Sequence, residues 1–145
     1  MGERTNVIGS RRFKELIVAE QFEDAAEIGR AQVRGGAQVL DVCLANPDRD
    51  EAADVDRLMT HLTRKVKVPL MIDSTDARVL ELALRHCQGK SVVNSINLED
   101  GEERFEKVGP LIRTYGAAVI VGCIDEDKQQ GMRSEERRVG KECRL

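Results

Sequence analysis

Short runs of aliphatic and β-branched residues alternate along the chain with longer stretches in which apolar residues recur every three or four positions. The short runs predict strands that are buried on both faces, as the strands of a parallel sheet are. Four strands are predicted, over Val39–Val42, Leu70–Ile72, Ser91–Val93 and Ala117–Ile124. Strands that alternate with helices are typical of parallel β/α units, in which the helices cover the sheet.

The stretches between these strands predict amphipathic helices with one apolar face each. The four apolar stripes comprise Phe22, Ala25, Ala26 and Val33; Ala52, Val55, Leu58, Met59 and Leu62; Val79, Leu80, Ala83 and Cys87; and Phe105, Val108, Leu111, Ile112 and Tyr115. Thr75 or Asp76 is placed to cap the third helix, and the glycines at 35–36, 89 and 116 follow helix ends. Right-handed crossovers would put every helix on the outer side of a sheet that curls into a barrel.

The length of the chain limits how much of a barrel it can form. A complete (β/α)₈ barrel typically takes about 250 residues, and this chain has 145. We therefore expect an α/β fold that is a partial TIM barrel, with roughly the first five β/α units. Met1 and Gly2 lead directly into a polar segment, so the first strand is expected to be truncated.

The last thirteen residues, 133–145 (RSEERRVGKECRL), differ in composition from the rest, with five basic and three acidic residues and no apolar stripe. Gly140-Lys141 is not a phosphate loop, because Glu142 stands where Ser or Thr is required. The string resembles the translation of a sequencing-library adapter. We therefore expect one partial domain over residues 1–132 and a non-native tail over 133–145.

Charge and composition exclude several classes of protein. The chain has 23 basic and 26 acidic residues, a net charge of -3, which argues against nucleic-acid binding by phosphate neutralisation. No apolar run approaches the roughly 20 residues that span a bilayer, and Met1 to Asn6 are too polar for a signal peptide. The four cysteines form no CxxC pair, which favours reduced thiols over a zinc site and predicts a cytoplasmic location.

Polar residues recur where the predicted strands end. Asp41 lies inside the VLDVC run, Asp73 and Asn94 directly follow the next two strands, and Asp125 follows the last one. A single Asp or Asn there commonly caps a helix or makes a turn, but recurrence in several units favours a ligand site. Carboxylates and a carboxamide without a metal-ligand pattern suit a neutral ligand rich in N–H donors, such as the edge of a pterin.

Five ordered blocks give the sequence a family resemblance. They are GERTN followed by GSRRF, GGAQVLDV, VPLMIDST, GKSVVNSINLEDGEERF and YGAAVIVGCIDEDKQQGM, and they span Gly2 to Met132. Together they resemble the pterin-binding domain of cobalamin-dependent methionine synthase. The blocks are shared more distantly with corrinoid-linked methyltetrahydrofolate methyltransferases, and more remotely with dihydropteroate synthase, whose NVTPDSFSDGG segment is absent here.

The resemblance implies a TIM barrel that holds 5-methyltetrahydrofolate, its substrate, at the C-terminal mouth. Glu3, Asp73 and Asn94 match pterin-contacting positions of the family. Asp73 would accept hydrogen bonds from the amino-pyrimidine edge, Asn94 would orient the ring near N5, and Glu3 would support the pocket. Asp41 would belong to the same pocket, and Asp125 would be peripheral. Asn94 is the expected catalytic residue, and its expected role is to orient the ring.

Three other residues have side chains that are often catalytic, but we predict no catalytic role for them. His61 and His86 lie in helical segments away from the strand ends, so surface or packing roles are predicted. Cys43 is interpreted as a small residue at a strand end rather than as a nucleophile. The donor of the proton that N5 must gain is not identified by the sequence.

Three functions stay open at this point. The first is the folate module of methionine synthase, which would present the methyl group to cobalamin on another domain, with zinc confined to a homocysteine domain. The second is a stand-alone methyltetrahydrofolate:corrinoid protein methyltransferase, and the third is a non-catalytic folate-binding fragment. Under the first, the partners are the cobalamin-binding and homocysteine-binding domains, and the chain alone is expected to be inactive.

Overall fold

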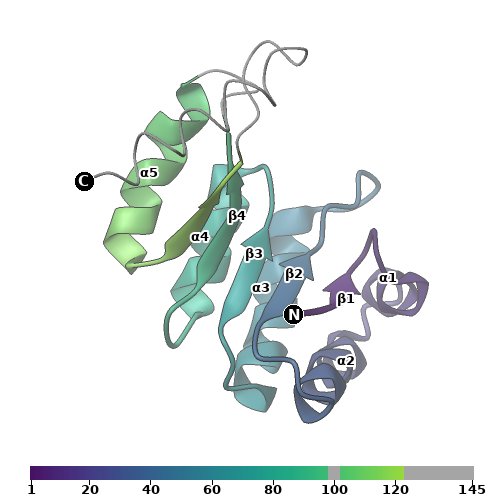
Figure 1. Cartoon of the computed structure of the whole chain (residues 1–145). Coiled ribbons are helices and arrows are strands. Elements are labelled where there is room, and N and C mark those ends of the chain that lie inside the picture. Colours follow the sequence, from purple (N-terminus) through teal and green to yellow (C-terminus); the bar gives the residue numbers. More distant parts are fainter. Residues whose placement is uncertain (98–101, 123–145) are drawn as a thin grey trace.

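The computed structural model describes residues 1–97 and 102–122, which form a five-stranded parallel sheet and five helices (Figure 1). The strands are β1 (Gly2–Asn6), β2 (Leu40–Cys43), β3 (Leu70–Asp73), β4 (Val92–Ile96) and β5 (Ala118–Val121). The helices are α1 (Arg11–Val18), α2 (Phe22–Arg34), α3 (Glu51–Lys65), α4 (Ala77–His86) and α5 (Glu103–Tyr115).

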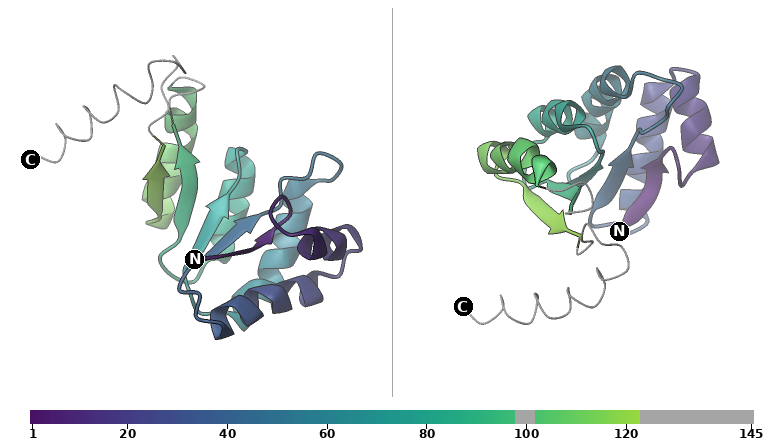
Figure 2. Two further views of the ribbon diagram at one scale, coloured as in Figure 1. Left: turned by 45° about the vertical axis from the view of Figure 1, so that its right-hand side comes forward. Right: turned by 90° about the horizontal axis from the view of Figure 1, so that it is seen from above.

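Each strand after β1 pairs in parallel with the strand that precedes it in the chain, so the order across the sheet is β1-β2-β3-β4-β5. The helices lie on one side of the curved sheet and leave the other side uncovered (Figure 2). This arrangement confirms the predicted α/β partial barrel, in which every crossover helix lies outside the sheet.

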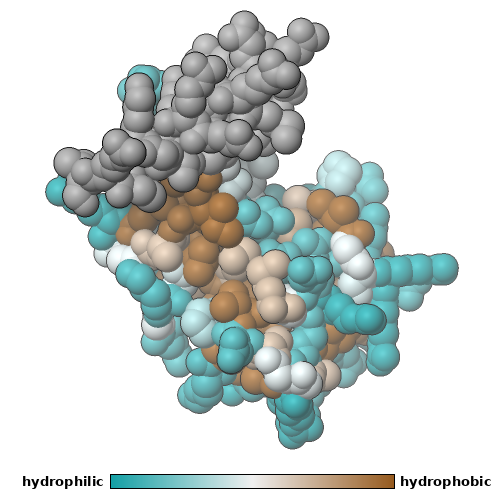
Figure 3. Space-filling model, in the orientation of Figure 1, coloured by the Kyte–Doolittle hydropathy of each residue, from teal (hydrophilic) through white to brown (hydrophobic). Residues whose placement is uncertain are grey.

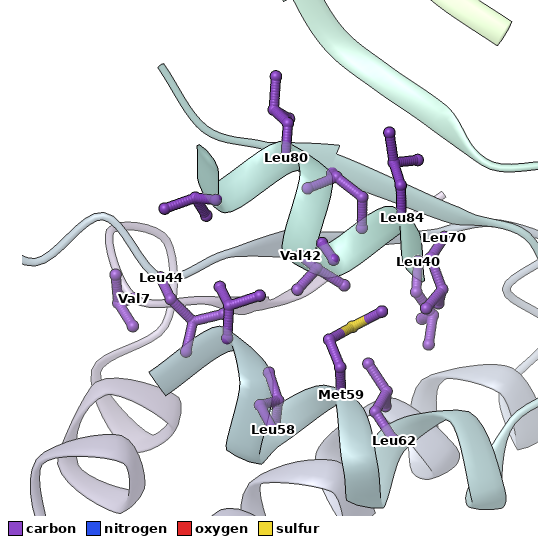
Figure 4. Close-up of a cluster of buried hydrophobic side chains, with 14 of the residues drawn as sticks. Val7, Leu40, Val42, Leu44, Leu58, Met59, Leu62, Leu70, Leu80 and Leu84 are labelled. Atoms are coloured by element: carbon purple, nitrogen blue, oxygen red, sulfur yellow. The ribbon is translucent and has the colours of Figure 1, made fainter. Parts of the chain in front are cut away.

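The core lies between the sheet and the helices. Leu40 and Val42 of β2 face Met59 and Leu62 of α3, and Leu70 of β3 lies beside them (Figure 4). Leu40, Met59 and Leu62 are completely buried. Burial of a side chain of this size contributes about 1.5–3 kcal/mol, so this interface fixes which face of each strand points away from the helices.

The helix ends follow the local chemistry of the sequence. Asp76 caps α4, because its side chain accepts a hydrogen bond from the backbone N–H of Arg78 at 2.8 Å. Asp50 caps α3 in the same way. Gly116 ends α5 in the left-handed conformation, with φ of 62°, which is the role expected of that glycine.

Two N-terminal elements differ from expectation. The structure extends β1 over Gly2–Asn6 and pairs it with β2, where the sequence predicted only a truncated strand. Helix α1 was not predicted. The side chain of Ser10 caps the start of this helix. The helix buries only Phe13 and Ile17, and two apolar positions do not form a recognisable stripe in the sequence.

Some predictions fall outside the described residues. Asp125 and the tail over 133–145 belong to this group, so their placement stays a prediction. In the described part of the chain, none of the helices has the length and apolar character that crossing a membrane requires.

Candidate functional site

The uncovered face of the sheet carries the predicted polar residues. Side chains alternate along a strand, so Asp41 points away from the helices because Leu40 and Val42 point toward them. Asp73 and Asn94 follow the buried Ile72 and Val93 and lie on the same uncovered face. Asp73 is the last residue of β3 and Asn94 the third residue of β4, rather than residues beyond the strand ends.

Asp73 and Asn94 are register partners on adjacent strands. Opposite residues on neighbouring strands lie close enough for their side chains to contact one ligand. The peptide bond that joins Asn94 to Ser95 is cis. The structure thus brings together the two residues on which the sequence-based site most depends.

Asn6 joins this group and was not among the predicted site residues. Its Nδ2 donates a hydrogen bond of 2.9 Å to Oδ2 of Asp41. Its Oδ1 accepts hydrogen bonds from the backbone N–H groups of Ile8, at 2.8 Å, and Gly9, at 3.0 Å. The turn after β1 therefore fixes the carboxamide with its NH₂ group toward Asp41. The GERTN block contains Asn6, but a single sequence gives no signal for its partner 35 positions away.

Asp41 is a buried carboxyl group with unused hydrogen-bonding capacity. Only 5% of the residue is exposed, and Oδ1 has no hydrogen-bond partner within the described structure. Burial raises the pKa of Asp41, the hydrogen bond from Asn6 lowers it, and the negative charge of Glu3 raises it further. An N–H donor placed at Oδ1 would offset part of the desolvation cost of the ionised form.

The pKa of Asp73 is also raised. Burial is the main cause, the charge of Asp41 adds to it, and the charge of Arg104 opposes it. The two carboxyl groups therefore share one electrostatic environment, and each disfavours ionisation of the other. A neutral ligand that donates N–H groups to both would favour their ionised forms.

Glu51, the first residue of α3, adds a third half-buried carboxyl group that sequence reasoning missed. Burial raises its pKa, a hydrogen bond with the Ser74 side chain lowers it, and the charges of Asp76 and Asp73 raise it. One of its oxygens, Oε1, lacks a hydrogen-bond partner in the described structure. Its sequence position suggested only the first turn of a helix.

Cys43 lies among these acids at the end of β2. Burial raises the pKa of its thiol to about 11, against a hydrogen bond from the backbone of Ala45, and the charges of Asp73, Asp41 and Glu51 add to the rise. The nucleophilic form of cysteine is the thiolate. Cys43 is therefore a protonated, unreactive thiol at neutral pH, which agrees with its interpretation as a small strand-end residue.

Arg104 of α5 spans the ends of β3 and β4. Its guanidinium donates to the backbone oxygens of Ser95, at 3.0 Å, Thr75, at 2.6 Å, and Ser74, at 2.9 Å. Five N–H donors in a fixed plane make such a triple contact possible for arginine. Sequence reasoning placed no functional residue in α5.

Two hollows lie beside the predicted site residues. An open cavity of about 1000 Å³ is lined by Glu3, Asn6, Asp41 and Asn94 among others. A cleft of about 460 Å³ is lined by Asp73, Ser95 and Arg104 among others. Glu3 is exposed and lines the larger of these hollows, and its negative charge raises the pKa of Asp41.

The opposite end of the sheet carries a smaller pocket that lies away from these acids. It has a volume of about 270 Å³ and is lined by residues that include Lys67 and Lys90 at the starts of β3 and β4. His86 is also remote from the site, since its Nε2 lies 2.8 Å from Oδ1 of Asp56 on α3. Among the described residues, no cluster of His, Cys, Asp and Glu is arranged to hold a metal ion.

The uncovered face is not uniformly polar. Apolar residues gather over β4 and β5, whereas polar residues predominate toward β1 (Figure 3). Ile120 and Val121 of β5 are 39% and 55% exposed. Ile120 is the register partner of Asn94, so the polar row ends against an apolar edge.

Comparison with known proteins shows the class of protein to which this chain belongs. Residues 2–144 match the family model described as pterin binding enzyme, and the chain belongs to that family. It is 41% identical over 132 residues to methionine synthase of Mycobacterium tuberculosis, and 42% identical over 132 residues to methionine synthase of Mycobacterium leprae. Both alignments cover 89% of this chain and 11% of the relative. The family predicted from the sequence blocks is confirmed.

Proposed function

We propose that this chain binds the pterin ring of 5-methyltetrahydrofolate and presents its N5-methyl group for transfer to cob(I)alamin in methionine synthesis. The observation that carries the proposal is the buried Asp41 carboxylate, whose Oδ1 has no hydrogen-bond partner among the described residues and which lies on the same sheet face as the register partners Asp73 and Asn94. Membership of the pterin-binding family and similarity to two methionine synthases support it.

The donor set suits a pterin. The amino-pyrimidine edge of the ring offers parallel N–H groups, which two carboxylate oxygens of Asp73 would accept. Asp41 would accept a further N–H through its free Oδ1. Asn94 can both donate and accept, so it would orient the ring on the N5 side. Glu3 would line the pocket at its outer edge, and Asp125 is kept as a peripheral contact.

Methyl transfer breaks the bond between N5 and the methyl carbon, and N5 must gain a proton for the amine to leave. Cobalamin, held by another domain, would supply the metal-centred nucleophile that accepts the methyl group. Asn94 has no dissociable proton in this pH range, so we give it an orienting part in catalysis. Binding alone does not accelerate the step. The site must hold the transition state more tightly than the substrate, and it must exclude water.

The chain spans 11% of the length of the methionine synthases it matches. Its part in methionine synthesis by a larger enzyme is therefore proposed here. The proposed partners are a cobalamin-binding domain and a homocysteine-binding domain with its zinc, in the cytoplasm. The alternatives are a stand-alone methyltransferase that serves a corrinoid protein and a non-catalytic folate-binding fragment. Similarity to methionine synthases favours the first function over both.

Calorimetric titration of the chain with 5-methyltetrahydrofolate tests the proposal directly. Asp73→Asn should weaken binding by about 1.5–3 kcal/mol, the range for hydrogen bonds to a charged group. Asp24→Asn, which makes the same change at an exposed position of α2, is the matched control and should bind like the original chain. No binding by the original chain, or equal binding by Asp73→Asn, would overturn the proposal.

A further inference from the structure

We propose that Arg104 is a positioning residue that holds Asp73 and Asn94 in their ligand-binding arrangement through its contacts with the main chain beside them. The inference deepens the proposed function and rests on it for the identity of the ligand. Arg104 lies on α5, the helix of the same β/α unit as Asn94 and one unit beyond Asp73. It is therefore a contribution to the site from an element that supplies none of the predicted pterin contacts.

The contacts of Arg104 are placed directly beside the two site residues. Ser74, whose carbonyl oxygen accepts from Nη2 at 2.9 Å, is the residue after Asp73. Ser95, whose carbonyl oxygen accepts from Nε at 3.0 Å, is the residue after Asn94. One rigid guanidinium thus links the backbone that follows both side chains, and Thr75 provides a third anchor through its oxygen at 2.6 Å. Because all three acceptors are main-chain atoms, these contacts fix the strand ends rather than a side chain.

The charge of Arg104 also acts on Asp73. Burial and the charge of Asp41 raise the pKa of Asp73, and Arg104 is the positive group that lowers it. A carboxyl group accepts hydrogen bonds from ligand N–H groups more strongly when it is ionised. Loss of this charge is therefore expected to move the ionisation of Asp73 to higher pH.

The stability of α5 does not explain why an arginine stands at this position. Arg104 is the second residue of the helix, and the positive end of the helix dipole disfavours a cation in the first turn. Its favourable interactions lie outside α5, with β4 and with the segment between β3 and α4. The contacts of Arg104 with the ends of β3 and β4 therefore explain why an arginine occupies this position.

Two substitutions separate geometry from charge. Arg104→Lys keeps the positive charge, but a single ammonium group cannot reproduce the planar contact with three carbonyl oxygens. Arg104→Gln removes the charge and most of the donors. Arg113→Gln removes the same charge from an exposed position on the same helix and serves as the control. Urea unfolding of each variant identifies any that is not folded, and Arg104→Lys then carries the test.

The readouts are calorimetric binding of 5-methyltetrahydrofolate across a pH series, and NMR titration of the Asp73 carboxyl carbon in the ligand-free chain. We expect Arg104→Gln to lose at least about tenfold in affinity, a change of about 1.4 kcal/mol, and to raise the Asp73 titration midpoint. Arg104→Lys should keep the midpoint near its original value but bind more weakly. Arg113→Gln should match the original chain in both measurements.

The two readouts distinguish failure of this inference from failure of the proposed function. An unchanged Asp73 midpoint in Arg104→Gln, or full affinity in both Arg104 variants, would overturn the positioning role. If the original chain does not bind 5-methyltetrahydrofolate, the proposed function fails. A raised Asp73 midpoint in the ligand-free Arg104→Gln chain would still support the action of Arg104 on Asp73 in that case.

Discussion

Asn6, the last residue of β1, and Asp41, the second residue of β2, lie 35 positions apart in the chain and share a hydrogen bond of 2.9 Å. The backbone N–H groups of Ile8 and Gly9 hold the other end of the Asn6 carboxamide, so its NH₂ group cannot turn away without losing both. The pair keeps a carboxylate inside the protein, with Oδ2 hydrogen-bonded and Oδ1 without a hydrogen-bond partner in the part of the chain that the structure describes. Such a group costs stability in the ligand-free protein and favours a ligand that can donate to it.

Replacement of Asp41 by Asn should stabilise the ligand-free chain at neutral pH and weaken its binding of 5-methyltetrahydrofolate. The folded state raises the pKa of Asp41, chiefly through burial. The folded protein therefore binds more protons than the unfolded chain between the ordinary and the raised pKa, so stability falls as the pH rises through that window. An Asn at this position does not ionise and avoids this loss.

Urea unfolding at a series of pH values, from about 4 to about 8, checks this prediction. The advantage of Asp41→Asn over the original chain should grow as the pH rises. Asp24→Asn, on the exposed face of α2, should show no comparable trend. An advantage for Asp41→Asn that shrinks with rising pH would contradict the assigned direction of the pKa shift.

The affinity for 5-methyltetrahydrofolate should fall when the pH is lowered, and the fall should begin above the pH at which ordinary aspartates protonate. Asp41 and Asp73 both have raised pKa values, and a protonated carboxyl group accepts N–H donors less well. Calorimetric titrations at decreasing pH measure the effect. The dependence should be shallower in Asp73→Asn, which has one titrating acceptor fewer. Equal slopes in the two proteins would count against Asp73 as an acceptor.

Removal of the Asp54 carboxylate should destabilise the fold strongly. Oδ2 and Oδ1 of Asp54 accept hydrogen bonds from Nε and Nη2 of Arg49 at 2.6 and 2.8 Å, and only 3% of the Asp54 side chain is exposed. Arg49 also reaches the backbone oxygen of Val18, so the pair ties the segment before α3 to the end of α1. Breaking a buried pair typically costs about 3–5 kcal/mol, and because Arg49 is partly exposed we expect a loss of about 3 kcal/mol.

Urea unfolding of Asp54→Ala measures this loss, with Glu15→Ala as the control. Glu15 pairs with Arg11 at 2.9 Å, but both side chains are well exposed, and such pairs contribute about 0–1 kcal/mol. A loss in Asp54→Ala no greater than the loss in Glu15→Ala would show that the buried pair does not anchor the segment.

The Cys43 thiol should react slowly with iodoacetamide in the folded chain. Its pKa is raised to about 11 and only 2% of the residue is exposed, so both the thiolate fraction and the access are small. Peptide mapping by mass spectrometry after labelling at about pH 8 should show at least a tenfold faster reaction in urea than in buffer. Labelling at equal rates in the two conditions would contradict the burial of this residue.

Much of the fold could be predicted from the sequence because its signals are local. Short apolar runs mark the strands β2, β3 and β4. Apolar residues that recur every three or four positions mark the helices α2 to α5. Strand β1 lacks such a run, because Glu3 and Arg4 are exposed and only Gly2 and Thr5 are buried. Helix α1 buries just two residues, so its short stripe was not distinguishable from a loop.

The part of the site that follows from the order of the parallel strands could be predicted from the sequence. Asp41, Asp73 and Asn94 share the strand ends of neighbouring parallel units, so their proximity follows from the strand order. Asn6, Glu51 and Arg104 could not be predicted from one sequence. Their parts depend on a turn that orients an amide, on burial against another element, and on side chain contacts with distant backbone oxygens.

The consecutive order of the strands bears on how the chain acquires its structure. Among the described strands, each from β2 onward pairs with the strand of the unit made just before it, so these pairings do not wait for a segment synthesised much later. Contacts between neighbouring units close short loops and favour rapid folding. On the ribosome, the growing polypeptide can therefore add one unit at a time to an already formed template, in the direction of translation.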